Sequence, residues 1–382
     1  MRIESCEVVG LFGNKQTIQT KFSHDLNILT GRNGAGKTSL LKLMWYIVSG
    51  NILLALKEIE FSRATVKTDH YECTVIRISH NTCKIEMTVG SEKFYFEDTR
   101  DEDENYLTNA EDEANSILQG IGSSVFFPTF RRIEGGFSLS TNLSQINNPF
   151  LNPRSLRPKN DIEEGLSALS KKLSNLEHIF VSAMSTADIV GMLLRKYTDL
   201  SELYNDLQSA ISQEVISTIK QYKSDKNDIK EIDTANSVLD AIRAKIESME
   251  VERESIMTPI TAVQGLVGKL FKHSGIKISN RLSFGDAASA VNSDLLSAGE
   301  KQMLSFICYN AFYKNSVVFI DEPELSLHVD WQRELFKILL EQQSSNQFII
   351  ATHSPFIYSR YPDREIMIDS DRGATGIGTY AA

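Results

Sequence analysis

An eight-residue stretch near the start of the chain decides the fold: Gly31-Arg32-Asn33-Gly34-Ala35-Gly36-Lys37-Thr38. It fits the pattern GxxxxGKS/T at every position. The glycines let successive backbone N–H groups point inward around an anion, and a helix that follows would offer its positive N-terminus to the same anion. The final lysine supplies a point charge for phosphate oxygens, and the threonine hydroxyl supplies a ligand for Mg²⁺. The residues predicted to bind a nucleotide's phosphates are Asn33, Gly34, Ala35, Gly36, Lys37, Thr38 and Ser39.

The sequence around this loop predicts alternating strands and helices. Residues 26–30 form a short apolar run typical of a buried strand, and residues 39–48 are typical of a helix. Further strands are expected at 3–9, 17–22, 71–79, 84–89, 93–96, 125–127, 347–351 and 366–368, each next to turn signals or loops. The acidic residues 97–113 are interpreted as a solvated surface loop, with a mimic of nucleic-acid charge as the alternative.

A second motif joins a fully apolar strand to two carboxylates, in Val317-Val318-Phe319-Ile320-Asp321-Glu322. Such a strand is typical of a parallel sheet, and ligands of open α/β sheets bind at the carboxyl edge of the strands. Asp321 is therefore predicted to hold Mg²⁺, directly or through water. Glu322 is predicted to polarise the attacking water as a general base.

Two shorter motifs lie on either side of these carboxylates. Residues 296–302 read Leu-Ser-Ala-Gly-Glu-Lys-Gln, and residues 352–355 read Thr-His-Ser-Pro directly after a predicted buried strand. Ser297 alone fits an ordinary helix N-cap, and a lone histidine such as His353 is more often structural. Their order after the phosphate loop favours a function for both.

Together the four motifs resemble those of ABC-type ATPases, in the form used by the SMC, Rad50 and RecF branch. The resemblance implies that Ser297, Gly299 and Glu300 form a signature motif that reaches the γ-phosphate bound to a second copy of the chain. It implies that His353 contacts the γ-phosphate as a switch histidine. The implied catalytic residues are Lys37, Glu322 and His353, and the implied ligands of Mg²⁺ are Thr38 and Asp321.

The segment after Glu322 narrows the resemblance. Residues 323–328 read Pro-Glu-Leu-Ser-Leu-His and correspond to the D-loop, which crosses the dimer interface in that family. The pair Leu327-His328 resembles OLD-type ATPases and the ATPases of antiphage systems, including PARIS, Septu and some retron-associated ones. A clear Q-loop glutamine is missing, and residues 127–132 occupy its expected region, so Arg131 or Arg132 is the candidate to act near the nucleotide or to couple it to the arm.

The resemblance implies an α/β fold: an ABC-type P-loop head with a mixed sheet flanked by helices, an antiparallel β subdomain and an inserted helical arm. Apolar residues recur at spacings of three and four within residues 161–257, which is typical of helices packed as a coiled coil. The predicted parts are residues 1–160 and 259–382 for the head and residues 161–258 for the insertion. The arm is equally compatible with a purely structural role and with a role in docking a partner protein.

The composition is ordinary for a soluble globular protein, with 41% hydrophobic and 24% charged residues. The net charge of −10 counts against a surface that grips DNA everywhere, although a local patch is compatible with it. The four cysteines, Cys6, Cys73, Cys83 and Cys308, form no CxxC pair, so neither zinc nor disulfides are indicated. Scattered free cysteines suit a reducing cytoplasm, where we expect the protein to be located. We expect no membrane-spanning helix, because no apolar run reaches about 18 residues.

The function expected from these features is an ATPase switch that traps ATP and Mg²⁺ between two copies and controls a separate effector, a nuclease, in bacterial antiphage defence. Because the residues after His353 are too few for a Toprim nuclease domain, which needs on the order of a hundred residues, we expect any nuclease activity to come from another polypeptide. The alternatives are a RecF-like repair ATPase that binds DNA, a scaffold that binds ATP without hydrolysing it, and the ATPase subunit of a transporter. The intact Glu322 argues against the scaffold.

Overall fold

The computed structural model describes residues 1–13, 16–100, 106–129, 161–181, 186–224, 239–254 and 297–368. The chain forms two compact units, the first made of Met1–Met184 with Tyr313–Ala382 and the second of Ser185–Phe312. The insertion was predicted over residues 161–258, whereas the second unit begins later, at Ser185, and ends later, at Phe312. Arg131 and Arg132 lie outside the described residues.

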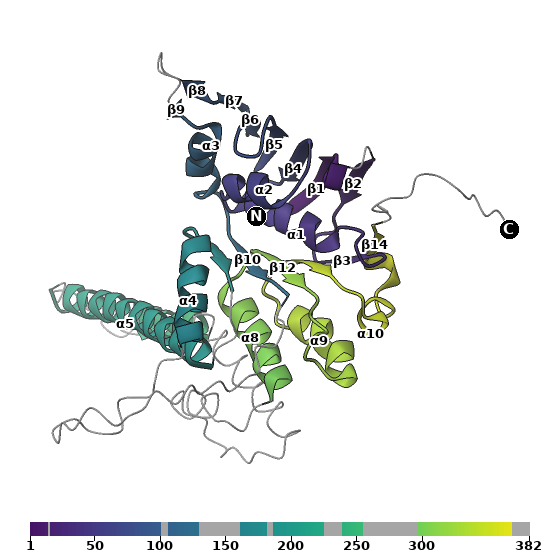
Figure 1. The fold of residues 1–382 in the computed structure, drawn as a ribbon. Helices are drawn as coiled ribbons and strands as arrows, with labels where there is room; N and C mark the ends of the chain where they lie inside the picture. The colour runs from purple at the N-terminus through teal and green to yellow at the C-terminus, as the bar shows by residue number, and fades with distance from the viewer. Residues whose placement is uncertain are drawn as a thin grey trace, which may run out of the picture. The chain divides into compact units, whose positions relative to one another are not determined.

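The first unit contains an antiparallel sheet of six strands (Figure 1). In spatial order its strands are β2 (Thr17–Lys21), β1 (Ile3–Val9), β4 (Arg63–Thr68), β5 (Tyr71–Arg77), β6 (Cys83–Val89) and β7 (Glu92–Glu97). Buried and exposed positions alternate along β4, β5 and β6, as expected for a sheet with one face on the core. This sheet is the predicted antiparallel subdomain.

A second sheet of six strands carries the motifs. In spatial order its strands are β11 (His178–Phe180), β10 (Ser124–Phe127), β12 (Val317–Asp321), β13 (Gln347–Ala351), β3 (Leu26–Thr30) and β14 (Glu365–Met367). All of these pairs are parallel, whereas a mixed sheet was predicted. Every residue of β3, β12 and β13 is buried, because both faces of such a sheet are covered.

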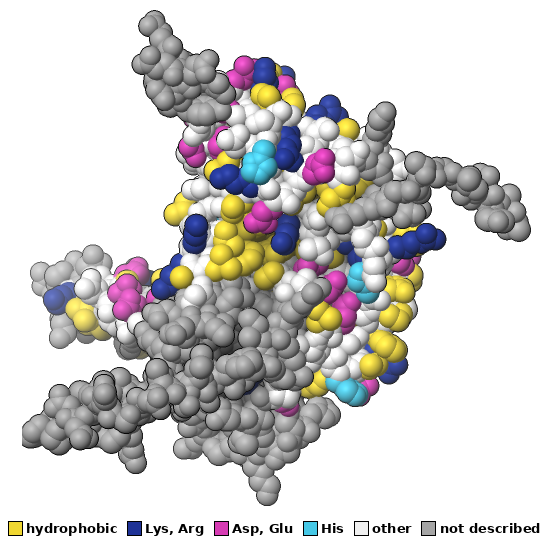
Figure 2. Space-filling model, in the orientation of Figure 1, with side chains coloured by type: hydrophobic (Ala, Val, Ile, Leu, Met, Phe, Trp, Pro, Cys, Tyr) yellow, Lys and Arg dark blue, Asp and Glu magenta, His cyan; other side chains and the backbone are white. Residues whose placement is uncertain are grey.

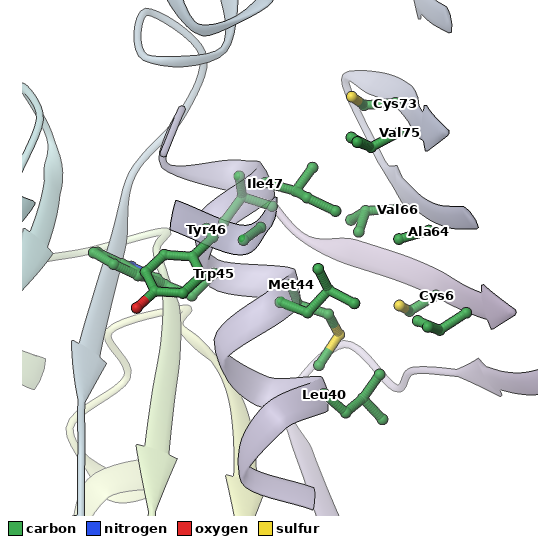
Figure 3. Packing of buried hydrophobic residues seen from close by; sticks show 14 of the residues in the cluster. Cys6, Leu40, Met44, Trp45, Tyr46, Ile47, Ala64, Val66, Cys73 and Val75 are labelled. Carbon is green, nitrogen blue, oxygen red and sulfur yellow. The ribbon is translucent and has the colours of Figure 1, made fainter. Parts of the chain in front are cut away.

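Helix α1 (Lys37–Val48) packs against strands of both sheets and fills the core between them. Figure 3 shows Leu40, Met44 and Ile47 pointing toward the antiparallel sheet, while Trp45 and Tyr46 point the other way. The Trp45 ring lies 5.2 Å from the rings of Phe126 and Phe180, measured between centroids. The helix that follows the phosphate loop is thus held on both sides by apolar contacts.

The opposite face of the parallel sheet is covered by α9 (Val329–Glu341). The Phe336 ring of α9 meets the Phe348 ring of β13 at 6.2 Å, whereas the neighbouring Ile349 belongs to the core around α1. Successive residues of a strand point to opposite faces, so the two helices sandwich β13. The remaining elements of this unit are α2 (Ile52–Glu58), α3 (Ala110–Leu118), α4 (Asp161–Leu173), α10 (Pro355–Tyr358), β8 (Thr99–Arg100), β9 (Tyr106–Thr108) and the 3₁₀ turns η1 (Leu11–Gly13) and η2 (Pro362–Arg364).

The acidic segment 97–113 is not a solvated loop throughout. Strands β8 and β9 pair within it, and α3 begins at Ala110. Glu111 is only 3% exposed, and burial raises the pKa of its carboxyl. The high charge of the segment concealed a short helix that packs its apolar side against the antiparallel sheet.

The helical pattern predicted within residues 161–257 is interrupted near its start. Helix α4 ends at Leu173, and Leu176 is exposed with a left-handed backbone φ of 46°. The chain then enters β11, which extends the parallel sheet beside β10. Residues 161–181 therefore belong to the first unit because a three-residue strand, too short to show a period, ends the helical pattern.

The second unit contains α5 (Thr186–Ser224), a helical segment at 239–254 and α8 (Ala298–Phe312). Lys245 forms an ion pair with Glu214, and the Arg253 guanidinium lies 5.7 Å from the centre of the Tyr204 ring. Because the partner numbers fall as those of the segment rise, residues 239–254 run antiparallel to α5. Coiled-coil packing of this arm stays a prediction. In the part of the chain that the structure describes, no helix is long and apolar enough to cross a membrane.

Candidate active site

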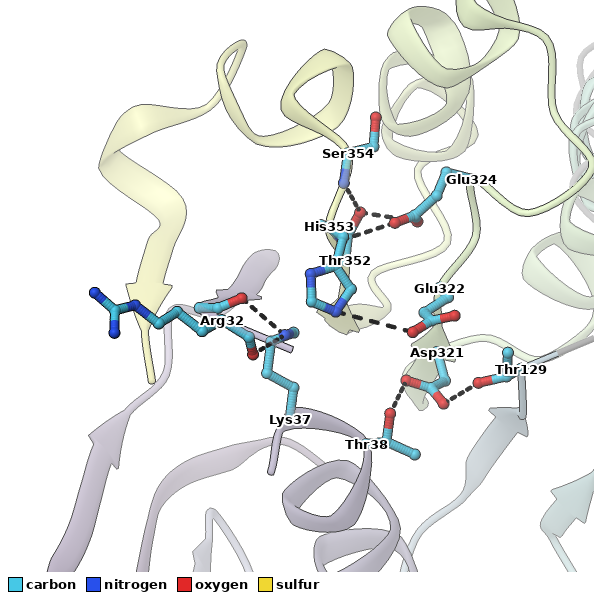
Figure 4. A network of polar contacts seen from close by, with 11 residues as sticks. Arg32, Lys37, Thr38, Thr129, Asp321, Glu322, Glu324, Thr352, His353 and Ser354 are labelled. Carbon is cyan, nitrogen blue, oxygen red and sulfur yellow. Dashed lines mark hydrogen bonds and ion pairs between the residues drawn. The ribbon is translucent and has the colours of Figure 1, made fainter. Parts of the chain in front are cut away.

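Three neighbouring strands bring the predicted site residues to one edge of the parallel sheet. The order β12, β13, β3 places the ends of the three strands side by side. The phosphate loop follows β3, Glu322 follows β12, and His353 follows β13 by two residues. Residues far apart in the sequence therefore share the carboxyl edge at which open α/β sheets bind ligands (Figure 4).

The phosphate loop ends in an open helix N-terminus. Gly36 is the N-cap of α1 in a left-handed conformation, with φ at 92°, and has no side chain to bond the first N–H groups of the helix. A Cβ atom at this position would lie 2.7 Å from Cε2 of Phe12, so the close packing of η1 also requires glycine. Free N–H groups and the helix dipole favour an anion at this end.

Lys37 is buried within the loop that it serves. Its Nζ donates to the carbonyl oxygens of Gly31 at 2.9 Å and Arg32 at 3.1 Å. Burial lowers the pKa of this ammonium group, while the nearby carboxylates of Glu322, Asp321 and Glu324 oppose that shift. The charge is thus held in place before any ligand binds. Asn33 and Gly34 are exposed at the tip of the loop, whereas Ala35 is buried and Thr38 and Ser39 are half-buried.

Asp321 is the most deeply buried carboxylate of the site, at 2% exposure. Thr38 Oγ1 donates to its Oδ1 at 2.9 Å, and Thr129 Oγ1 donates to its Oδ2. Burial raises the pKa of Asp321, against the two hydroxyl hydrogen bonds, which favour the ionised form. Thr129 was missed in the sequence, because a threonine after a strand carries no pattern that marks it.

The pairing of Thr38 with Asp321 fits a magnesium site. Both atoms are hard oxygen donors, and Mg²⁺ takes few protein ligands because it keeps several waters and binds substrate phosphates. Among the described residues, no group of three or more His, Cys, Asp and Glu side chains could hold a metal on its own. A cation here would therefore rely on the phosphates of the nucleotide as further ligands.

Glu322 and His353 face each other across the gap between β12 and β13. His353 Nε2 lies 3.9 Å from Glu322 Oε1, with the side chains 36% and 26% exposed. Glu322 has a left-handed backbone φ of 49°, and its N–H donates to the carbonyl of Ala351 at 2.8 Å. A strained backbone held by a neighbouring strand is typical of functional positions. Both side chains are partly exposed to solvent at this edge of the sheet.

A third carboxylate, that of Glu324, accepts hydrogen bonds from the segment that carries His353. Thr352 Oγ1 donates to Glu324 Oε2 at 2.8 Å, and the backbone N–H of His353 donates to Glu324 Oε1 at 2.7 Å. Sequence reasoning assigned the segment to the D-loop but gave this glutamate no role. The Asp-Glu-Pro-Glu spacing was the available signal, since it places a further carboxylate near the same sheet edge.

The Leu-His pair of the D-loop has a local structural explanation. Leu327 is buried, whereas His328 is exposed and forms the N-cap of α9 by accepting from the Asp330 N–H at 3.4 Å. Asp330 Oδ2 lies 3.3 Å from the same imidazole nitrogen. The leucine thus anchors the loop and the histidine begins the helix.

The signature residues belong to the second unit. Ser297 and Glu300 form a capping box at the start of α8, because the Glu300 N–H donates to Ser297 Oγ at 3.3 Å and Ser297 N–H donates to Glu300 Oε2 at 2.8 Å. The N-cap reading of Ser297 is therefore correct as local structure, and Gly299 lies within the first turn. Their contact with a nucleotide stays a prediction.

Comparison with known proteins gives one family and several relatives. The family model described as the AAA ATPase domain matches residues 1–358. Endonuclease GajA of Bacillus cereus (strain VD045) is 38% identical over 79 residues, which cover 19% of this chain and 14% of that protein. The chain thus matches a small part of that relative's length.

Two solved structures of Smc head domains align with 94% of this chain. One is the Pyrococcus furiosus Smc head with an extended coiled coil, bound to the C-terminal domain of ScpA, with 91% of that chain covered, 13% identity and a TM-score of 0.37. The other is an Smc head bound to the C-winged helix domain of ScpA, with 92% covered, 11% identity and a TM-score of 0.39.

Proposed function

Because the chain belongs to the AAA ATPase domain family, we propose that it binds ATP with Mg²⁺ at the edge of β3, β12 and β13 and hydrolyses it. The observation that carries the proposal is the convergence of Thr38 with Asp321 and of Glu322 with His353 at that edge. The same edge receives the N-terminus of α1 and the ammonium group of Lys37.

The proposed reaction uses each group for one task. The loop N–H groups and Lys37 bind the β- and γ-phosphates, and Thr38 and Asp321 would hold Mg²⁺, which would neutralise charge on the phosphates. Glu322 accepts a proton from water as the water oxygen bonds to the γ-phosphorus and the bond to the ADP oxygen breaks. His353 contacts the γ-phosphate beside that carboxylate. The products are ADP and phosphate.

We further propose that ATP is enclosed between two copies of the chain. Ser297, Gly299 and Glu300 of one copy would complete the site of the other, with the N-terminus of α8 directed at the γ-phosphate. In support, Ser297 is exposed at that N-terminus. The exposed Leu325 and His328 would lie at the same interface, as the D-loop resemblance implies.

The biological role proposed is a cytoplasmic switch in antiphage defence that controls a separate effector, a nuclease. The 79 residues shared with Endonuclease GajA and the Leu327-His328 variant support it. A DNA-binding repair ATPase is the rival. Acidic and basic side chains are interspersed over the described surface of the first unit on the face shown in Figure 2, which favours the switch.

The test uses the Glu322→Gln variant, with Glu341→Gln on the exposed end of α9 as the control carboxylate. We expect wild type and control to hydrolyse ATP, and Glu322→Gln to form a dimer with ATP and Mg²⁺ that persists in light scattering. Mass spectrometry of the trapped dimer from its host should identify a nuclease in fixed ratio. If the wild-type protein does not hydrolyse ATP, the ATPase proposal is refuted. If DNA and repair proteins accompany the dimer in place of a nuclease, the DNA-repair function is supported.

A further inference from the structure

Glu324 is a carboxylate at the sheet edge for which the proposed reaction has no chemical task. Both of its oxygens accept hydrogen bonds from the segment after β13, one from the Thr352 hydroxyl and one from the His353 N–H (Figure 4). Hydrogen bonds to an ionised acceptor are stronger than neutral ones. Glu324 therefore ties the loop after β12 to the loop after β13.

We call these two hydrogen bonds from Glu324 to residues 352–353 the clamp. The backbone of Glu324, from which the clamp extends, is itself held by hydrogen bonds. The carbonyl oxygen of Glu324 accepts from the N–H groups of Ser326 and Leu327, each at 3.0 Å, and from Gln332 Nε2 at 3.4 Å. Gln332 lies on α9, so the backbone of Glu324 is bonded to both its own loop and that helix. Because its backbone is held in this way, the Glu324 side chain can fix the position of the residues that it contacts.

The residues that donate to Glu324 are also held in place by further hydrogen bonds. Thr352 is fully buried, and its hydroxyl also accepts from the Ser354 N–H at 3.0 Å. Ser354 Oγ in turn donates to Gln332 Oε1 at 2.6 Å, which closes a ring of hydrogen bonds back to α9. His353 lies between Thr352 and Ser354 and has its own N–H held by the carboxylate. Its imidazole is thereby directed toward Glu322.

We propose that Glu324 is a positioning residue that sets the reach of His353 toward the terminal phosphate of the bound nucleotide. The inference rests on the proposed function. Because Glu324 links them, residues 324–328 and His353 move together. A displacement of residues 325–328 would therefore displace His353 as well.

Charge gives Glu324 a second effect, which the test must separate from positioning. Its carboxylate lies close enough to Lys37 to favour the charged form of that ammonium group. Replacing Glu324 by Gln removes the charge but keeps an oxygen that accepts from the His353 N–H. Replacing it by Ala removes both.

The experiment measures ATP turnover and the affinity ratio of a non-hydrolysable ATP analogue to ADP, both with Mg²⁺. Glu324→Ala should lower kcat about 10- to 100-fold with little change in KM, because a small displacement of a reacting group has such an effect. It should lower the affinity ratio as well. In a His353→Ala background the same change should alter either quantity less than about twofold, because the clamp then has no imidazole to place.

Glu324→Gln should stay within about threefold of wild type, because the oxygen that holds His353 is retained. Thr352→Val nearly keeps the shape of the side chain but removes one of the two hydrogen bonds to Glu324, together with the acceptor for the Ser354 N–H. It should give an intermediate loss, which serves if Glu324→Ala folds poorly. Glu334→Gln, which breaks an exposed pair with Arg360, is the control and should match wild type.

Equal losses for Glu324→Gln and Glu324→Ala would show that charge matters and would overturn the inference. A loss that persists undiminished without His353 would do the same. The affinity ratio tests the clamp even in a chain that binds ATP without turnover, so failure of the ATPase proposal and failure of this inference give different results.

Discussion

Thr38 Oγ1 donates a 2.9 Å hydrogen bond to Oδ1 of Asp321, a residue that stands 283 positions further along the chain. The bond exists because β3, which leads into the phosphate loop, and β12, which ends at Asp321, flank β13 in one sheet. It leaves a carboxylate almost fully buried, where burial disfavours its charge. A cation bound beside Asp321 would favour the ionised form that burial disfavours.

Replacing Asp321 by Asn should stabilise the nucleotide-free protein while abolishing hydrolysis. Burial raises the pKa of Asp321 above its ordinary value of 3.8, so the folded chain binds this proton more tightly than the unfolded chain. The contribution of that proton to the free energy of unfolding is full at low pH and is lost as the pH rises through the raised pKa. The melting temperature of Asp321→Asn should therefore exceed that of wild type at pH 7, and the gap should narrow on acidification.

The control for this prediction is the ligand. Adding ATP with Mg²⁺ should raise the melting temperature of wild type more than that of Asp321→Asn, because the variant lacks the carboxylate that helps to hold the cation. A variant that melts below wild type at pH 7 without ligand would contradict the argument from burial.

Thr129 should be needed for full activity through the other oxygen of Asp321. Thr129→Val keeps the shape but leaves Oδ2 without its hydroxyl donor. An unsatisfied buried acceptor costs about 1–3 kcal/mol, so we expect a matching loss of kcat, about tenfold, and a higher Mg²⁺ requirement. Thr129→Ser restores the donor and should recover most of the rate. Titration of turnover against Mg²⁺ checks both variants, and a fully active Thr129→Val would refute the role.

The sequence was most informative where a local pattern reflects a local cause. The apolar runs predicted the three central strands of the parallel sheet, because strands buried on both faces have no polar side. The phosphate loop was evident from its glycines and Lys37, since the chemistry of the site lies within eight residues. The carboxylates Asp321 and Glu322 followed from their place at the end of an apolar strand.

Features that depend on distant partners were not predictable in the same way. The engagement of Thr129 and Glu324 requires knowledge of which strands are neighbours, and no local period reports that. Helix α3 was concealed because Glu111 is buried although charge usually indicates solvent. Strand β11 lies in the region that was predicted to be helical, because Phe180 happens to continue the spacing of the apolar residues of α4.

His178 on β11 should make stability depend on acidity. Burial lowers the pKa of this imidazole from 6.5 to about 4, and its Nδ1 lies 2.8 Å from Ser124 Oγ. A lowered histidine pKa means that the neutral form favours folding, so its contribution is full above about pH 6.5 and is lost as the pH falls toward 4. The expected loss is roughly 3 kcal/mol at most. His178→Gln should flatten the decline of the melting temperature between pH 6.5 and 4, and an unchanged slope would exclude His178 as the cause.

Two of the three glycines in the phosphate loop, Gly34 and Gly36, allow the cost of backbone strain to be measured apart from the cost of a steric clash. Gly34 and Gly36 have φ at 83° and 92°, but a Cβ atom would meet nothing within 4 Å at Gly34 and would lie 2.7 Å from Phe12 Cε2 at Gly36. Gly34→Ala should therefore lose only the strain of a left-handed residue, about 1–2 kcal/mol, whereas Gly36→Ala should lose more. Phe12→Ala added to Gly36→Ala should recover part of that difference in urea unfolding. Equal losses for the two glycine variants would mean that η1 yields, and that Phe12 does not determine the shape of the loop.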